Sequence, residues 1–338
     1  MVSIQSHSSG GIERTIFLVL IIFIGSCLSS CVPSVKKLSE ENGYLFTYFV
    51  KNGEDGLHLA TSRDGYTWKK IERRKEHWLP AIGNSKLMRD PSVAQGPDGT
   101  YHLVWTSGWN ENNIGYASTR DFIQWSAQQE IPVMAHEPQV RNSWAPEIVY
   151  DKQAKQFVIF WASTIPDRFN ETNESSEDNY NHRLYYTTTR DFKLFTPTRL
   201  FYDPGFSVID ATFFSFNNQL QLIIKDETRF PPKKYLQLVS ADSFTGPFSK
   251  PGSPITPQGY WVEGPTAVQV GDYAVIYFDA YTSRKYGAIR SKDLIQWEDI
   301  SPQVQLPDED TPFRVRHGTI IPVSLDLIKE LEEASSKQ

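Results

Sequence analysis

Short segments of alternating hydrophobic and polar residues recur along the chain, and this period of two is typical of β-strands with one buried face. Four of them align without gaps: LHLATSRDGYTW (57–68), IGYASTRDFIQW (114–125), LYYTTTRDFKLF (184–195) and YGAIRSKDLIQW (286–297). A fifth, YLQLVSADSFTGPF (235–248), has two extra residues in its turn. Each is a strand, a polar turn with an aspartate, and then an aromatic residue. The sequence therefore predicts a fold assembled from repeated strand units.

The aspartates of these turns are interpreted as structural residues. At the end of a strand, an aspartate can accept hydrogen bonds from the amides of its own turn. The aromatic residue that follows is then expected to cover the edge of the strand pair. The five aspartates are Asp64, Asp121, Asp191, Asp242 and Asp293.

A second series of acidic residues opens the first strand of four units. Counted to the turn aspartate of the same unit, they lie 31, 44, 32 and 30 residues upstream, and they are Asp90, Glu147, Asp210 and Glu263. The longest spacing contains a polar insertion, IPDRFNETNESSEDNYN, which is expected to form a surface loop.

The two ends of the repeated region complement each other. HGTIIPVS, from His317, begins a strand with no partners after it, whereas residues 45–50 and 57–62 are strands that lack a first strand. Joined, they complete a fifth unit. Units of roughly 50 to 60 residues of this kind predict an all-β fold, a five-bladed β-propeller closed by pairing of the C-terminal strand with N-terminal strands. The alternative, an open β-sandwich, does not explain a missing strand at each end.

The first strand of each propeller blade lines the central channel, so its starting residues should converge at one mouth. The five residues expected there are Asp90, Glu147, Asp210, Glu263 and His317. Converging carboxylates suit either a cation such as calcium, which binds six to eight oxygens, or acid–base chemistry. Glycoside hydrolysis uses two separated carboxyl groups, one protonated and one ionised. Trp109 and Trp144 are candidates for stacking on sugar rings, and they favour glycoside hydrolysis.

Five segments, in order and at blade spacing, resemble glycoside hydrolase family 43. They are RDPSVAQGPDGTYHLVW, NSWAPEIVYD, SVIDATFF, VEGPTAVQVGDYAVIYF and RHGTI, within residues 44–324. The resemblance implies inverting hydrolysis, with Asp90 as general base, Asp210 as the residue that tunes and orients the acid, and Glu263 as the acid. Glu147 is interpreted as a substrate-binding or orienting residue. His317 would help to hold a metal ion, a structural Ca²⁺ in the channel, while the reaction itself would require no cofactor.

The residues before Glu263 bear on its role as the acid, because an acid must stay protonated near neutral pH. Tyr260, Trp261 and Val262, together with a second carboxylate, are expected to raise the pKa of Glu263.

The predicted activity is that of a glycosidase, exo-acting on α-L-arabinofuranosides or β-xylosides. The motif RDP, in which Arg89 precedes the base, also resembles a motif of the fructan-cleaving relatives with the same five-bladed fold. A retaining glycosidase of the fructan type or a galactofuranosidase therefore stays open as an alternative. A third alternative is a surface lectin that binds glycan without cleaving it.

The N-terminal region has the pattern of a targeting segment. Arg14 precedes the apolar run TIFLVLIIFIG, and LSSC, ending at Cys31, resembles a bacterial lipobox. We expect residues 1–31 to be a lipoprotein signal and residues 32–43 to be a linker. Cys31 is the expected site of lipidation, and Cys27, in IGSC, is the alternative. The propeller should then span 44–325 and be followed by a tail at 326–338. The protein is accordingly expected to be lipid-anchored in the bacterial cell envelope.

Charge and cysteine content limit the partners. The net charge is −6, and no cluster of Lys and Arg occurs along the chain, which argues against nucleic acid. With two cysteines, both in the N-terminal region, the domain itself has no disulfide or thiolate metal site. We expect a monomer that acts on carbohydrate and meets the membrane through its N-terminal lipid alone.

Overall fold

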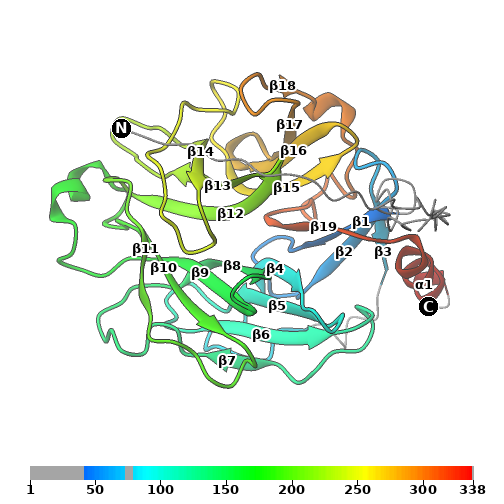
Figure 1. The fold of residues 1–338 in the computed structure, drawn as a ribbon, viewed down its shortest axis with the longest axis horizontal. Coiled ribbons are helices and arrows are strands. Elements are labelled where there is room, and N and C mark those ends of the chain that lie inside the picture. The colour runs from blue at the N-terminus through cyan, green and yellow to red at the C-terminus, as the bar shows by residue number, and fades with distance from the viewer. Residues whose placement is uncertain (1–41, 73–78, 337–338) are drawn as a thin grey trace, which may run out of the picture. The chain divides into compact units, whose positions relative to one another are not determined.

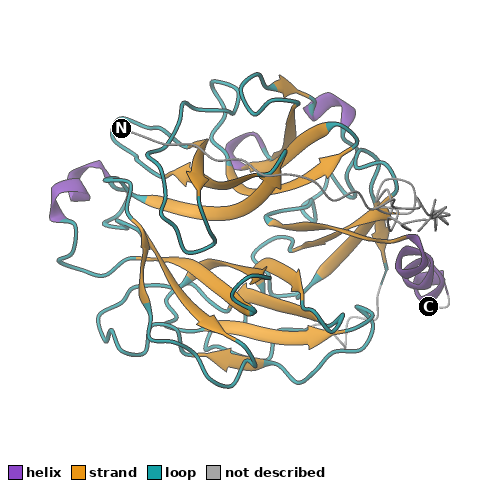
Figure 2. Cartoon of the chain, in the orientation of Figure 1, coloured by secondary structure: helices purple, strands orange, loops and turns teal. Residues whose placement is uncertain are grey.

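The structure is a computed structural model that describes residues 42–72 and 79–336. The predicted lipoprotein signal, with Cys27 and Cys31, lies outside the described residues. Five antiparallel sheets stand around a central axis and form the predicted five-bladed β-propeller (Figure 1). Strands and loops make up nearly all of the described chain (Figure 2).

In blades 1 to 4, the strands follow one another outward from the axis in the order in which they occur along the chain. Blade 1 consists of β4 (Arg89–Gln95), β5 (Tyr101–Thr106), β6 (Ile114–Thr119) and β7 (Gln129–Ile131). Blade 2 consists of β8 (Trp144–Asp151), β9 (Gln156–Ser163), β10 (Arg183–Thr189) and β11 (Arg199–Tyr202). Blade 3 consists of β12 (Val208–Phe216), β13 (Gln219–Asp226) and β14 (Tyr235–Ala241). Blade 4 consists of β15 (Glu263–Val270), β16 (Tyr273–Ala280), β17 (Lys285–Ser291) and β18 (Glu298–Asp299).

Blade 5 combines segments from both ends of the described chain. Its strands are β19 (Gly318–Ser324), β1 (Asn42–Tyr48), β2 (His58–Ser62) and β3 (Lys69–Ile71). β19 and β1 are antiparallel, with Phe46 opposite Ile320. The innermost strand of this blade thus comes from the C-terminal region and the others from the N-terminal region.

The core is divided into five apolar clusters, one between each pair of neighbouring blades. Blades 4 and 5, for example, share a cluster in which Phe46 and Tyr277 are fully buried. The second strand of each blade contacts such a cluster on both faces, and in β16 every residue after Tyr273 is buried. This explains why the second strands read as nearly continuous apolar runs rather than as alternating ones.

Four of the five turn aspartates have the predicted structural role. In blade 1, Asp121 Oδ1 accepts hydrogen bonds from the amides of Ile123 and Gln124 at 2.8 and 2.7 Å. The same pair of bonds is made by Asp64, Asp191 and Asp293. The prediction is wrong for Asp242, because in that longer turn Ser243 Oγ accepts the bond, from Thr245 N at 3.2 Å.

Two peripheral segments are more ordered than the sequence indicated. The polar insertion between β9 and β10 contains the 3-10 helix η2 (Asn170–Ser175), and beyond it Glu177 is bonded to Lys234, in the segment before β14. The stretch that the sequence assigned to a tail forms α1 (Leu325–Ser336), whose Leu327, Ile328 and Leu331 are buried against blade 5. Among the described residues, no helix has the length and apolar character needed to cross a membrane.

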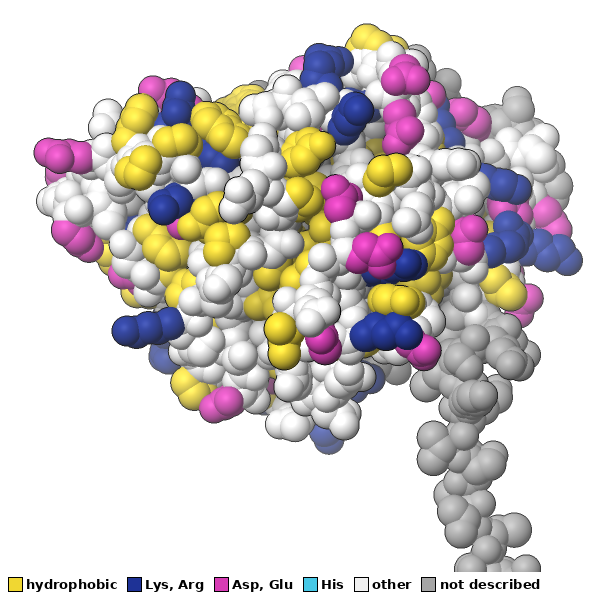
Figure 3. Space-filling view, turned by 90° about the horizontal axis from the view of Figure 1, so that it is seen from above, with side chains coloured by type: hydrophobic (Ala, Val, Ile, Leu, Met, Phe, Trp, Pro, Cys, Tyr) yellow, Lys and Arg dark blue, Asp and Glu magenta, His cyan; other side chains and the backbone are white. Residues whose placement is uncertain are grey.

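On the face of the molecule in Figure 3, acidic and basic side chains are interspersed, with apolar side chains between them.

Candidate active site

A β-bulge at the start of the first strand shapes the mouth of the channel in blades 1 to 4. In each of these blades the pairing with the second strand shifts register over two residues. The first residue of each bulge has a positive φ. These residues are Asp90, Ala145, Asp210 and Gly264, with φ of 51°, 47°, 52° and 58°. Bulges of this kind re-aim side chains next to functional sites.

The acidic residues of the four blades do not occupy equivalent positions relative to the bulges. The prediction that they are equivalent is therefore wrong. Asp90 and Asp210 lie within their bulges, whereas Glu263 comes one residue before the bulge, at the level of Arg89 and Trp144. Glu147 comes after its bulge, at the level of Ser92 and Thr212. The funnel is therefore built in layers, with Glu263 outermost and Glu147 deepest.

The two outer layers line a pocket of about 250 Å³, here called the central pocket. The outermost layer supplies Arg89, Trp144, Ile209, Glu263 and Arg316. The next supplies Asp90, Ala145, Asp210 and His317. The rest of the wall consists of the second-strand residues Thr106 and Lys225, together with Trp109, Glu227 and Tyr281. The structure thus brings the three predicted catalytic carboxylates, from blades 1, 3 and 4, to one pocket.

Asp90 is held as a carboxylate by its neighbours. Its Oδ1 lies 3.3 Å from His317 Nδ1, and its Oδ2 accepts a hydrogen bond from Thr106 Oγ1 at 2.8 Å. Burial alone would raise the pKa of Asp90, but the hydrogen bond and the charge of His317 hold it well below its usual range. Asp90 is accordingly ionised across the neutral range.

Glu263 is also paired with cations, which the sequence did not indicate. Its Oε1 accepts a hydrogen bond from Arg316 Nη2 at 2.8 Å, and its Oε2 lies 3.4 Å from Lys225 Nζ. Burial favours the neutral form, but the charges of Lys225 and Arg316 outweigh it and lower the pKa of Glu263. The expectation that Tyr260 and its neighbours give this residue a raised pKa is therefore wrong for the free protein.

Asp210 lies beside Glu263 and has the opposite shift. Its Oδ2 accepts a hydrogen bond from the amide of Gly264 at 2.9 Å, which fixes the carboxyl group against the start of β15. Burial, with the nearby negative charges of Glu263 and Asp90, raises the pKa of Asp210 to about 6. Of the two neighbouring carboxyl groups, Asp210 is the one that holds a proton more readily.

Gly264 explains the Gly-Pro break after Glu263. A Cβ at this position would lie 2.4 Å from His317 Cγ, and the φ of 58° is unfavourable for other residues. The glycine allows the backbone of blade 4 to pass against the imidazole while its amide points at Asp210.

Glu147 was interpreted from the sequence as a substrate-binding or orienting residue, and it does not line the central pocket. The side chain is buried beneath the pocket, where its Oε2 accepts hydrogen bonds from Ser92 Oγ at 2.9 Å and Thr212 Oγ1 at 3.3 Å. Burial raises its pKa to about 7. Glu147 therefore ties together blades 1, 2 and 3 from inside the channel.

His317 is arranged as a hydrogen-bonding cation. Burial would lower its pKa, but the hydrogen bond to Asp90 and the negative charges of Asp210 and Glu147 raise it to about 9. Within residues 42–72 and 79–336, no group of three or more His, Cys, Asp or Glu side chains is placed to hold a metal ion. In this layer of the channel the positive charge comes from the imidazolium of His317.

Trp109 and Trp144 both lie at the wall of the central pocket, as predicted. Their ring centroids are 5.5 Å apart, with the rings nearly perpendicular, and Trp144 Nε1 donates to the carbonyl of Trp109 at 2.9 Å. Trp109 is 43% exposed and covers the guanidinium of Arg89. An exposed indole at the mouth offers a flat apolar surface of the kind that can stack on a ligand.

The sequence interpretation missed the basic residues of the site. Lys225 ends an apolar strand and is only 2% exposed, and a lysine in such a run is the signal that could have been noticed. Arg316 directly precedes His317 and is bonded both to Glu263 and, through its Nε, to buried Asp279 at 3.1 Å.

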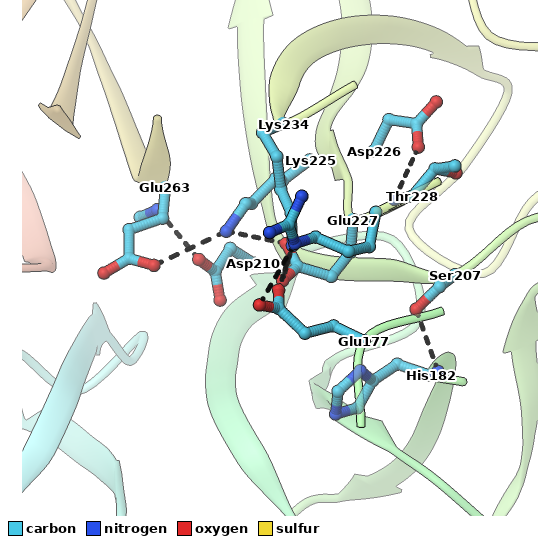
Figure 4. A network of polar contacts seen from close by, with 12 residues as sticks. Glu177, His182, Ser207, Asp210, Lys225, Asp226, Glu227, Thr228, Lys234 and Glu263 are labelled. Atoms are coloured by element: carbon cyan, nitrogen blue, oxygen red, sulfur yellow. Dashed lines mark hydrogen bonds and ion pairs between the residues drawn. The ribbon is translucent and has the colours of Figure 1, made fainter. Parts of the chain in front are cut away.

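A series of ion pairs connects Glu263 to the periphery of the molecule (Figure 4). From Glu263 the ion pairs run to Lys225, from Lys225 to Glu227 at 2.7 Å, and from Glu227 to Lys234. Lys234 is in turn paired with Glu177 of the insertion at 2.9 Å. Both buried cations of this series, Lys225 and Lys234, are paired with carboxylates, which is the condition for placing charge away from water.

The architecture and the pocket together define a propeller whose axial mouth gathers three carboxylates. The family described as a probable glycosyl hydrolase domain, related to glycoside hydrolase family 43, matches residues 40–328, and the chain belongs to this family.

Among curated proteins, an α-L-arabinofuranosidase of Bifidobacterium longum subsp. longum is 24% identical over 205 residues, which cover 54% of this chain and 19% of that protein. The chain thus spans less than a fifth of the length of this relative. Two solved structures share the fold at 16% identity. A family 43 protein of Bacillus licheniformis has a TM-score of 0.51, with 69% of this chain and 45% of that chain covered. An α-L-arabinofuranosidase from Lactobacillus brevis has a TM-score of 0.50, with 63% and 72% covered.

Proposed function

We propose that the protein is an inverting glycosidase that removes single sugar units, α-L-arabinofuranosyl or β-xylosyl, from the ends of glycans. The observation that carries the proposal is the convergence of Asp90, Asp210 and Glu263 from three blades on one pocket. Membership of the family and the similarity to an α-L-arabinofuranosidase support it.

The size of the central pocket supports action on a chain end. Its volume of about 250 Å³ is below the roughly 300–1,000 Å³ of pockets that enclose drug-sized ligands. A single sugar ring matches this space better than several rings in a row. Trp109, exposed at the wall, would contact an apolar face of that ring.

Asp90 would act as the general base. It is largely but not fully buried, ionised and oriented by Thr106 and His317, so it can accept the proton of a water that attacks the anomeric carbon. The attack by water from the face opposite the leaving group inverts the anomeric configuration.

Glu263 would act as the general acid and protonate the leaving oxygen. In the free protein its carboxylate is paired with Arg316 and Lys225, so the protonated form is a minor species near neutral pH. Asp210, next to it, would limit the charge that the pair carries by staying protonated below about pH 6. The proposal therefore implies a mildly acidic pH optimum.

A panel of nitrophenyl glycosides tests the activity. We expect hydrolysis of the α-L-arabinofuranoside or the β-xyloside, with little action on fructans and galactofuranosides. Binding of glycan with no cleavage of any member of the panel would instead support the lectin alternative.

We further propose that Cys31 carries lipid and attaches the enzyme to the cell envelope, with support from LSSC after the apolar run. Mass spectrometry of membrane-extracted protein should find a diacylated Cys31 as the first residue. An unmodified terminus at another residue would contradict this proposal.

A further inference from the structure

A second, larger cavity lies at the outer part of blade 4, and no role has been given to it. We propose that this outer cavity binds the leaving-group side of the glycan, as a site for sugar units beyond the bond that is cleaved. The inference rests on the proposed function, and it makes the enzyme selective for longer chains even though it releases one sugar at a time.

The outer cavity has a volume of about 620 Å³, more than the central pocket. Its lining comes from blade 4 and from the segments that flank it in the chain, including Pro257, Tyr260, Tyr286 and Arg314. Tyr260 is 41% exposed, so its ring is accessible to a ligand at this wall.

The chemistry of the lining favours a neutral saccharide. Three basic residues and three acidic residues contribute to it, namely Arg284, Lys285, Arg314, Asp299, Glu309 and Asp310. Such a balanced set favours a ligand with many hydroxyl groups over one with a net charge, because hydroxyls can donate to carboxylates and accept from cations. Buried Phe278 and Leu306 add apolar surface, which suits the C–H faces of sugar rings.

The outer cavity adjoins the side of the central pocket on which Glu263 lies. The 3-10 helix η3 (Tyr281–Ser283) separates them, with Tyr281 at the central pocket and Ser283 at the outer cavity. A buried bridge also joins them, because Asp279 is bonded to Arg314 at 2.8 Å and to Arg316 at 3.1 Å. Arg314 lines the outer cavity and Arg316 the central pocket.

This placement identifies which part of the substrate the cavity would take. A general acid lies next to the oxygen of the leaving group, since it must protonate that oxygen. If Glu263 is the acid, the remainder of the glycan leaves the central pocket on the blade 4 side, toward η3 and the outer cavity. Asp90, from blade 1, would face the attacking water instead.

The test compares substrates of increasing length on the full enzyme and on two variants. The substrates are the nitrophenyl monoglycoside and linear α-1,5-arabino-oligosaccharides or β-1,4-xylo-oligosaccharides of two to six units, according to the sugar that the panel identifies. Wild-type kcat/KM should increase with length, by roughly three- to tenfold in total, as expected for added aromatic contacts. Tyr260→Ala should abolish most of this increase and leave the rate on the monoglycoside unchanged.

Phe313→Ala is the matched control, because Phe313 is 44% exposed on the segment before Arg314 yet does not line the cavity. It should retain the dependence on length. A wild-type rate that is the same for all lengths, or an increase that persists in Tyr260→Ala, would overturn the inference. An equal loss in both variants would overturn it as well.

A binding measurement separates this inference from the proposed function. With Glu263→Gln, which should bind with little turnover, titration calorimetry with both the arabino- and the xylo-tetrasaccharide should show weaker binding of at least one of them once Tyr260→Ala is added. If the monoglycoside is not cleaved by the wild type but a tetrasaccharide binds in this way, the proposed activity fails and the site stands. If cleavage is observed and Tyr260→Ala leaves binding unchanged, the site fails and the activity stands.

Discussion

The repeat places acidic residues at two kinds of position, in the outer turns and at the funnel, and the two sets differ in where their partners come from. Asp121 is satisfied by amides two and three residues further along the chain. Glu263 is paired with Lys225 and Arg316, 38 and 53 residues away, and Asp90 with His317 of another blade. Local partners make the turn acids structural parts of one blade. Distant partners give each funnel acid its own electrostatic environment, and that difference is what permits separate chemical roles.

The largest expected difference between the two sets is in catalysis. Asp90→Asn should lower kcat by roughly 10²–10⁴-fold on all substrates, since the attacking water loses its base. Asp121→Asn is the matched control and should leave kcat unchanged. Steady-state kinetics on the best nitrophenyl glycoside provide the comparison, and comparable losses for both variants would remove the distinction.

Glu263→Gln should have an effect that depends on the leaving group. With an oligosaccharide, whose leaving oxygen needs a proton, the rate should fall by roughly 10²–10³-fold. With a nitrophenyl glycoside the loss should be smaller, because nitrophenolate departs without protonation. The rates of both substrates measured side by side would expose an error if the losses were equal.

His317 should make stability depend on pH on the alkaline side. Its folded-state pKa of about 9 lies above the ordinary value of 6.5, so its contribution is complete below about pH 6.5 and is lost as the pH rises through 9. The free energy of unfolding should fall over this window by on the order of 2–3 kcal/mol. Denaturant unfolding of His317→Gln should show a much flatter dependence there, whereas His182→Gln, at a histidine whose burial lowers its pKa to about 3, should keep the wild-type window.

The pairing of Glu263 predicts two pH shifts of opposite sign. Lys225→Met removes a cation that lowers the pKa of Glu263, so the alkaline limb of kcat/KM should move to higher pH. Asp210→Asn removes a neighbouring negative charge, so the same limb should move to lower pH. Lys234→Met is the control, because Lys234 is bonded to Glu227 and Glu177 instead. Shifts in the same direction for the first two variants would refute the assignment of Glu263 as the group that must be protonated.

The smallest effect is expected in a turn. Asp121→Ala removes two hydrogen bonds to backbone amides and should lower the free energy of unfolding by about 1 kcal/mol, with activity unchanged. Thermal unfolding and the standard assay measure the two quantities. A loss of activity at normal stability would mean that the turn acids are not purely structural.

The same contrast explains how far the sequence could be interpreted. Alternation and turn chemistry are local, so the five-bladed fold and the role of Asp121 could be predicted. The layering of the funnel depends on bulges, and these disguised the fact that Ala145, not Glu147, corresponds to Asp90. Pro91, Pro146 and Pro265, which follow the positive-φ residues directly, were the signal for the correct alignment.

The electrostatic environment of the funnel carboxylates could not be predicted from local sequence. The apolar residues before Glu263 suggested a raised pKa, but Lys225 and Arg316 reach it from other blades and reverse the shift. The pairing of His317 with Asp90 was equally invisible, because the two residues lie in different blades and far apart in the chain. Pairings between blades follow from the closed ring and not from neighbours in the chain.

The stereochemistry of the first-formed sugar tests the central claim most directly. Proton NMR during the first minutes of hydrolysis distinguishes the two anomers before mutarotation mixes them. If Asp90 is a base that activates water and Glu263 is the acid, the released sugar should first appear with the anomeric configuration opposite to that of the substrate. A first product that retains the configuration would contradict the account, because one of the funnel carboxylates would then have to be a nucleophile.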